Sequence, residues 1–200
     1  MFKNIIENIN ENIDALQVFD TIHGLTHLVE ENQVDTETGE VLDSTMIYPA
    51  CYISNGQFDH VAFDNKVNVC YIRRNGDISI DENLEYELGC EDSLILTQSF
   101  RLVGLLFNVD IDDEYRDEKQ ASNIIHAIHE SDNRKICSEM SIDSIKVKPT
   151  RISTDRYAMT RAEFQNIDIA IPYESIIFAI DMDVIIETSK DCWCNFYKKC

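Results

Sequence analysis

Apolar residues at the start of the chain recur every three or four positions, with Asn, Glu and Asp between them. That spacing is typical of one face of an α-helix, and it predicts a single helix from residue 2 to about residue 30. Gly24 is a candidate point of interruption, because glycine costs about 1 kcal/mol in a helix interior. The predicted apolar face consists of Phe2, Ile5, Ile6, Ile9, Ile13 and Leu16.

After an acidic stretch, the apolar period changes to two. Residues 31–45 are predicted to form an acidic loop with a turn at Thr38 and Gly39. Two Asn-Gly pairs, at residues 55–56 and 75–76, predict hairpin turns between consecutive strands. The extended segments predicted from alternation are residues 46–53, 57–63, 65–74, 77–81 and 93–109.

Helical spacing returns once, over about residues 112–131, where acids fill the first turn and favour the positive end of the helix dipole. Its inward stripe is predicted to be Ala121, Ile124, Ile125 and Ile128. Residues 141–153 and 157–171 are predicted to be extended. Gly104, in the strand before this helix, is a candidate β-bulge.

The last predicted strand covers residues 174–189. Even positions from Ile176 to Ile186 are apolar, whereas Asp181, Asp183 and Glu187 lie on the other face, so the strand is expected to be half-buried with one acidic face.

Together these elements predict an α+β fold, with the N-terminal helix and the second helix packed on one face of an antiparallel sheet. The length of 200 residues fits one domain. The expected parts are the helix at 1–30, the acidic loop at 31–45, the sheet with its helix at 46–190, and a tail at 191–200.

Composition narrows the function classes. Lys and Arg total 17 and Asp and Glu total 37, a net charge of −20. Tight DNA binding is therefore not expected, because nucleic-acid binders neutralise phosphates with a basic face. The N-terminus lacks the pattern of a signal peptide, and no apolar run approaches the roughly 18 residues of a membrane span. The seven cysteines are accordingly expected to be reduced thiols in a cytosol.

The C-terminal "DCWCNFYKKC" contains the densest candidate chemistry. Cys192, Cys194 and Cys200 supply three thiols, but a structural zinc site usually has two close pairs of ligands. No second pair exists in the sequence. We therefore interpret the tail as strand-end packing and predict no metal ligand there, while zinc held with an isolated Cys or His remains the alternative.

Two further clusters have a spacing close to that of known sites. His126, His129 and Glu130 have helical metal-binding spacing but lack the His-Glu-x-x-His order. Asp181 and Asp183, followed by Glu187 and Lys190, faintly resemble a metal-dependent nuclease site, but the spacing of the lysine is wrong.

The acidic segment at residues 110–118 lacks the calcium-loop pattern. No glycine-rich phosphate loop or nucleophile elbow occurs either. No catalytic, cofactor-binding or metal-binding residue is predicted, and the chain is expected not to be an enzyme.

The order of helix, antiparallel strands, helix and final strand resembles the small tail-terminator and neck-ring proteins of tailed bacteriophages. "IPYESIIFAIDMDVIIETSKDCWC", at residues 171–194, looks like the terminal strand of such proteins in crAss-like phages of gut Bacteroidetes. The acidic loop at 30–45 and the cysteine tail depart from that family. The resemblance implies a virion structural protein without a cofactor, located in the neck or tail and assembled in the bacterial cytoplasm.

Family members form rings of six or twelve copies, so the expected partners are copies of this chain and the neighbouring portal, neck or tail proteins. Twelve copies at −20 each would carry about −240 formal charges, which would let DNA pass without being bound. An acidic lumen is expected from the Asp181 and Asp183 face and from the acid-rich second helix. Two alternatives remain open: an acidic adaptor or immunity-type binding module for a basic partner, and a divalent-metal nuclease.

Overall fold

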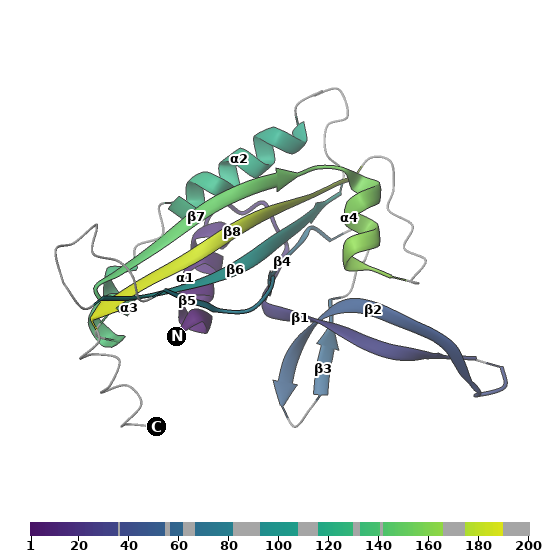
Figure 1. Ribbon diagram of the computed structural model, residues 1–200. Coiled ribbons are helices and arrows are strands. Elements are labelled where there is room, and N and C mark those ends of the chain that lie inside the picture. The colour runs from purple at the N-terminus through teal and green to yellow at the C-terminus, as the bar shows by residue number, and fades with distance from the viewer. Residues whose placement is uncertain are drawn as a thin grey trace.

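One mostly antiparallel sheet organises the chain in the computed structural model, which describes residues 1–35, 37–54, 57–61, 67–81, 93–107, 116–129, 133–140, 142–165 and 175–189 (Figure 1). Within those residues the sheet has eight strands, in the order β3-β2-β1-β4-β6-β8-β7, and β5 also pairs with β6. The pairing of β1 with β4 is parallel. The α+β prediction is confirmed.

The strands are β1 (Thr21–Val34), β2 (Val41–Ser54), β3 (Gln57–His60), β4 (Val69–Arg74), β5 (Ser79–Asp81), β6 (Ser93–Leu106), β7 (Ser144–Ser153) and β8 (Ile176–Ser189). The helices are α1 (Phe2–Asp14), α2 (Arg116–His129), α3 (Arg134–Met140) and α4 (Arg156–Glu163). None of these described helices has both the length and the apolar character needed to cross a bilayer.

The main core lies between one face of the sheet and the helices α1 and α2. Alternate residues of β6 and β8, such as Phe100 and Ile180, project into it and are fully buried. Each fully buried side chain of this size contributes about 1.5–3 kcal/mol of hydrophobic stabilisation. The prediction that both helices pack on one face is confirmed, and their apolar stripes face this core. The buried stripe residues are Phe2, Ile5, Ile6, Ile9, Ile13, Ala121, Ile124 and Ile128.

The predicted helix at residues 2–30 is wrong beyond Asp14, where α1 ends. Gln17 adopts a left-handed backbone conformation with φ 53°, which turns the chain out of the helix. From Thr21 onward the sequence is rich in β-branched residues, which favour strands, and it forms β1. Leu16 is 37% exposed and lies outside the helical stripe predicted for it.

The predicted acidic loop at 31–45 is also wrong, since strands occupy most of it. β1 continues to Val34 and β2 begins at Val41. The predicted turn is present: Gly39 has φ 72° and its amide donates to the carbonyl of Asp35 at 2.8 Å. The two strands pair across it and project from the rest of the sheet as an extended hairpin (Figure 1).

Two further predictions are wrong, and one helix was not predicted at all. Residues 157–163 are not extended but belong to α4, which Asp155 caps by accepting from the amide of Ala158 at 3.0 Å. The turn at Gly76 does not fold β5 back on β4; both strands pair with β6, one after the other. α3 is a helix for which no separate prediction was made.

Gly104 is not at a bulge, because the registers of β6 with β4 and with β8 run through it without a shift. Its neighbour across the sheet is Phe178, a fully buried side chain. A Cβ atom at Gly104 would lie 2.4 Å from Cζ of Phe178. The glycine is therefore required by close packing of an aromatic ring over the strand.

We predict that Gly104→Ala lowers the free energy of unfolding by about 1–3 kcal/mol, since a closely packed core cannot absorb the extra methyl group without displacing the ring. Equilibrium urea unfolding measures it. Gly24→Ala is the matched control, because an added Cβ there meets nothing within 4 Å, and it should change stability by less than about 0.5 kcal/mol. Equal effects of the two substitutions would contradict the packing explanation.

Candidate functional site

The face of the sheet opposite α1 and α2 carries a buried ion-pair network centred on Glu163. This residue is the last of α4 and is completely buried. Its carboxylate accepts from Nε and Nη2 of Arg73, each at 2.8 Å, and from the hydroxyl of Tyr71 at 3.1 Å. Both donors lie on β4, two residues apart, and therefore point to the same face. Three strong hydrogen bonds offset the cost of burying the charge.

The network continues across β6 and β8. Nη1 of Arg101 lies 3.6 Å from Oε1 of Glu163, and the same guanidinium holds Asp181 with two hydrogen bonds of 2.6 and 3.0 Å. The hydroxyl of Ser99 donates to Asp183 at 2.6 Å. These contacts follow from the strand register, because residues directly opposite each other share a face.

The predicted acidic face of the last strand is therefore a mixed-charge face. Asp181 and Asp183 do share one side of β8, as predicted, but Arg101 binds the first and Ser99 the second. On the other side of β8, Arg151 and Lys148 lie opposite these two aspartates in the register. The prediction of a half-buried strand is wrong, because most of β8 is buried on both faces: Ile177 and Ala179 belong to a second core on the face opposite Phe178. Both edges of the strand are paired, with β6 and with β7.

This arrangement does not support the nuclease alternative. The carboxylate of Asp181 is occupied by an arginine, and Glu187 is buried and accepts from the hydroxyl of Ser144 at 3.2 Å. Lys190 lies outside the described residues. Among the residues that are described, no three His, Cys, Asp or Glu side chains are grouped so as to hold a metal ion.

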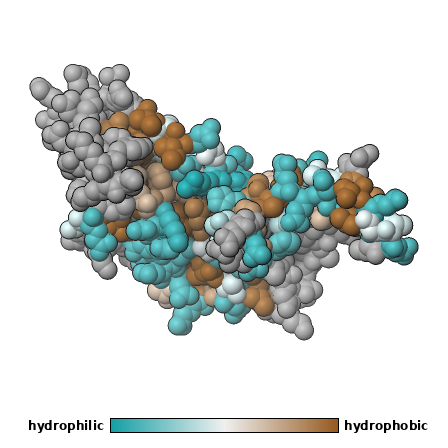
Figure 2. Space-filling model, turned by 90° about the horizontal axis from the view of Figure 1, so that it is seen from below, coloured by the Kyte–Doolittle hydropathy of each residue, from teal (hydrophilic) through white to brown (hydrophobic). Residues whose placement is uncertain are grey.

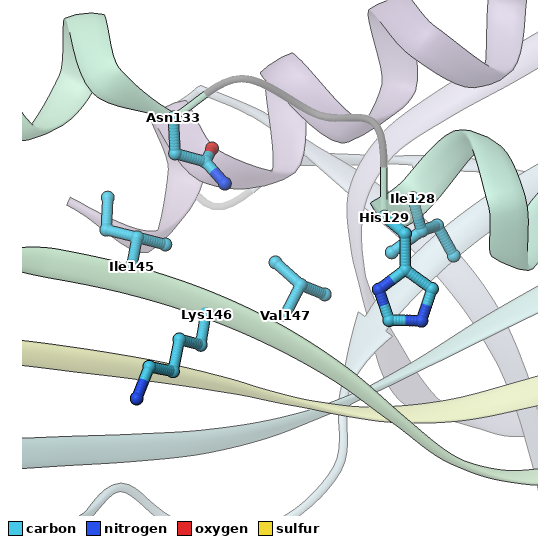
Figure 3. Close-up of a pocket in the computed structure, with 6 residues that line it drawn as sticks. All are labelled: Ile128, His129, Asn133, Ile145, Lys146 and Val147. Atoms are coloured by element: carbon cyan, nitrogen blue, oxygen red, sulfur yellow. The ribbon is translucent and has the colours of Figure 1, made fainter. Parts of the chain in front are cut away.

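The histidine cluster on the second helix is partly described. His126 and His129 are exposed on α2, and Glu130 lies outside the described residues. His129 borders a pocket between α2, α3 and β7 (Figure 3). Ile145 and Val147 project from β7 towards it, and Asn133 reaches it from the start of α3. The side-chain oxygen Oδ1 of Asn133 also accepts a hydrogen bond from the side-chain amide Nδ2 of Asn8 at 2.9 Å, which links this site to α1. The other lining residues are Ile128 and Lys146.

The described cysteines behave as buried or half-buried thiols. Cys70 is fully buried, and burial raises the pKa of its thiol. Burial, and then the charge of Asp59, also raises the pKa of Cys51. Neither has the lowered pKa of a reactive cysteine. The C-terminal Cys192, Cys194 and Cys200 lie outside the described residues, as does most of the acidic segment at 110–118, so both predictions stay predictions.

Sequence reasoning missed an arm, made of residues 28–45, that projects from the sheet (Figure 1). β4 pairs with β1 only as far as Thr26, and β3 pairs with β2 only from Ala50 onward. Between these points Ile47 also forms an antiparallel bridge with Gln165, and the carbonyl of Pro49 accepts from the amide of Val61. Farther out, from residue 32 to residue 45, the two strands pair only with each other within the part of the chain that the structure describes. The residues at 21–34 that favour strands were the sequence signal that could have predicted the first strand of the arm.

The arm exposes apolar side chains that its own chain does not cover, and Figure 2 shows such residues on the projecting hairpin at the right. The seven residues of β1 from Leu28 to Val34 make the arm about 23 Å long at the usual rise per residue of a strand. The exposed fractions of its large apolar side chains are 38% for Leu28, 53% for Val34, 65% for Val41 and 42% for Leu42.

We predict that Glu163→Ala lowers the free energy of unfolding by about 3–5 kcal/mol, because Arg73, only 8% exposed, would lose its buried counter-charge. Chemical denaturation measures the loss. Replacing both Arg73 and Glu163 with Leu should recover most of it, since no unpaired buried charge then remains. A loss below about 1 kcal/mol in the single variant would show that water already solvates the arginine.

Alkaline pH offers a second test of the network. Burial, followed by the charge of Glu163, raises the pKa of Tyr71 well above its usual value of 10.0. The folded state therefore favours the neutral phenol, so stability is complete below about pH 10 and falls as the pH rises further. Tyr71→Phe should reduce that slope by up to about 1.4 kcal/mol per pH unit in unfolding measurements. Tyr157→Phe, at a residue 72% exposed, is the control and should leave the slope unchanged.

Comparison with known proteins assigns no family to this chain. No protein-family model matches it, and no curated protein matches it in sequence. A functional interpretation therefore depends on the geometry described above: a closed ion-pair network that fastens α4 to the sheet, and an arm whose apolar side chains are left uncovered.

Proposed function

We propose that this chain is a non-enzymatic structural protein of a tailed bacteriophage, forming a ring of six or twelve copies in the head–tail connector or tail. The arm carries the proposal. It presents four large apolar side chains to solvent on a hairpin whose outer part, residues 32–45, forms strand pairs only within itself among the described residues. Exposed apolar surface and unpaired strand edges favour association with another chain.

The tail-terminator-like arrangement belongs to the same proposal. The two helices on one face of an antiparallel sheet are consistent with it, and the net charge of −20 suits a conduit through which DNA slides without being held. The expectation of an acidic lumen loses one of its two supports, because Asp181 and Asp183 are engaged by neighbouring side chains. Any acidic lumen would have to come from other carboxylates.

The network on the opposite face supports a structural role as well. Its carboxylates and guanidinium groups satisfy one another, and the central carboxylate is sealed from solvent. Such a network rigidifies a fold. A ring subunit gains from a rigid body, because small errors in the angle between subunits prevent closure.

Native mass spectrometry of the chain under reducing conditions tests the proposal. Closed assemblies of six or twelve copies are expected. The same measurement with a chelator should give the same masses, since the C-terminal cysteines are predicted not to hold zinc between subunits. Cys192→Ser with Cys194→Ser should likewise leave assembly intact. A monomer at every concentration would instead favour the acidic adaptor, and a zinc-dependent assembly would overturn the interpretation of the tail.

A further inference from the structure

One edge strand of the sheet carries three cations and no acid. Residues 144–153 contain Lys146, Lys148 and Arg151 and no Asp or Glu, a net charge of +3. Since the whole chain has a net charge of −20, all its other residues together carry −23. This segment is β7, the last strand in the order of the sheet. We call Lys146, Lys148 and Arg151 the basic edge.

The basic edge faces outward. Ile145 and Val147 pack against the main core, so Lys146 and Lys148, which alternate with them, point to the opposite face. On that face Lys148 and Arg151 lie opposite Asp183 and Asp181 of β8 in the register. Lys148 and Arg151 are exposed, and neither forms an ion pair with another described residue. β7 pairs with β8 on one side only, and no described strand lies along its other side. Ile152, at the end of the strand, is 41% exposed.

The arm has the complementary character. Residues 28–45 contain six acids and no Lys or Arg: Glu30, Glu31, Asp35, Glu37, Glu40 and Asp43. Apolar side chains lie among them, with Val41 the most exposed. A basic strand edge with an exposed isoleucine and an acidic, apolar hairpin match in charge, in strand geometry and in hydrophobicity.

A chain cannot satisfy this match by itself. The arm extends from β1 and β2, whereas the basic edge lies beyond β4, β6 and β8. Four strand spacings from β1 to β7 amount to about 19 Å, and the arm projects away from the sheet rather than across it (Figure 1). The partner for the arm is therefore on another molecule.

We propose that the arm of one copy docks on the basic edge of the next copy, through charge pairing and through strand-to-strand contact along the open side of β7. The contact joins different surfaces of identical chains, so it is heterologous, and it closes into a ring when the rotation per copy divides the circle. This inference rests on the proposed ring function and names the two surfaces that would build it.

Two charge-reversed variants test the docking. Lys148→Glu with Arg151→Glu changes the charge of the edge from +3 to −1. Glu30→Lys, Glu31→Lys, Glu37→Lys and Glu40→Lys together change the charge of the arm from −6 to +2. Each variant alone should raise the concentration needed for half-assembly at least about tenfold, because like charges then meet. Mass photometry or analytical ultracentrifugation at low salt measures this shift, and circular dichroism confirms that each variant is folded.

Mixing the two variants provides the decisive arm of the experiment. In the mixture an acidic edge meets a basic arm, and an acidic arm meets a basic edge, so assemblies of alternating subunits should form again. Lys3→Glu with Lys119→Glu, at two exposed lysines on α1 and α2, makes the same change of charge elsewhere and should leave assembly as in the unaltered chain.

The outcomes separate the two proposals. Assembly that neither variant weakens, or that mixing fails to restore, would overturn docking of the arm on β7 while leaving the ring itself intact. An unaltered chain that stays monomeric would overturn docking and remove the support for the ring at the same time. Loss in both variants with recovery in the mixture would support the docking.

Discussion

The buried carboxylate of Glu163 is the constraint on which the arrangement of this molecule depends. An uncompensated charge in that position would cost several kcal/mol, so the carboxylate requires Arg73 and Tyr71 beside it. The requirement fixes where the end of α4 rests on the sheet. It also aligns β4 with β6 and β8, because Arg101 bridges the same carboxylate to Asp181.

That arrangement leaves little uncovered surface at the middle of the sheet and much of it at the two ends. α1 and α2 cover one face, and α4 with the ion-pair network occupies part of the other. Among the described residues, the acidic arm projects near one end of the sheet and β7, with its three cations, forms the edge at the other. The two ends of the sheet therefore differ: the arm is acidic and has exposed apolar side chains, whereas β7 carries three cations. Such a difference suits head-to-tail association of identical copies.

Local patterns predicted the elements well wherever one local signal decided them. The stripe of α2 and the alternation of β8 both lie where their periods placed them, because each buries one continuous apolar face. The prediction failed where two local signals competed. Helical spacing continues up to Leu16, but Gln17 ends the helix and a β-rich stretch follows. The acids of the arm favour a loop by composition, although several of them lie on strands.

The α+β class, the two helices of the main core, most of the strands and the strong negative charge can be predicted from the amino-acid sequence, because each depends on composition or on a period within one segment. Which charges meet depends on the folded arrangement of the strands. Asp181 was an unpaired acid in the sequence and is bound by a residue 80 positions away; Glu163 was one acid among 37 and is the buried centre of the network. Pairing of that kind depends on strand order and register, which long-range packing sets and which no local period encodes.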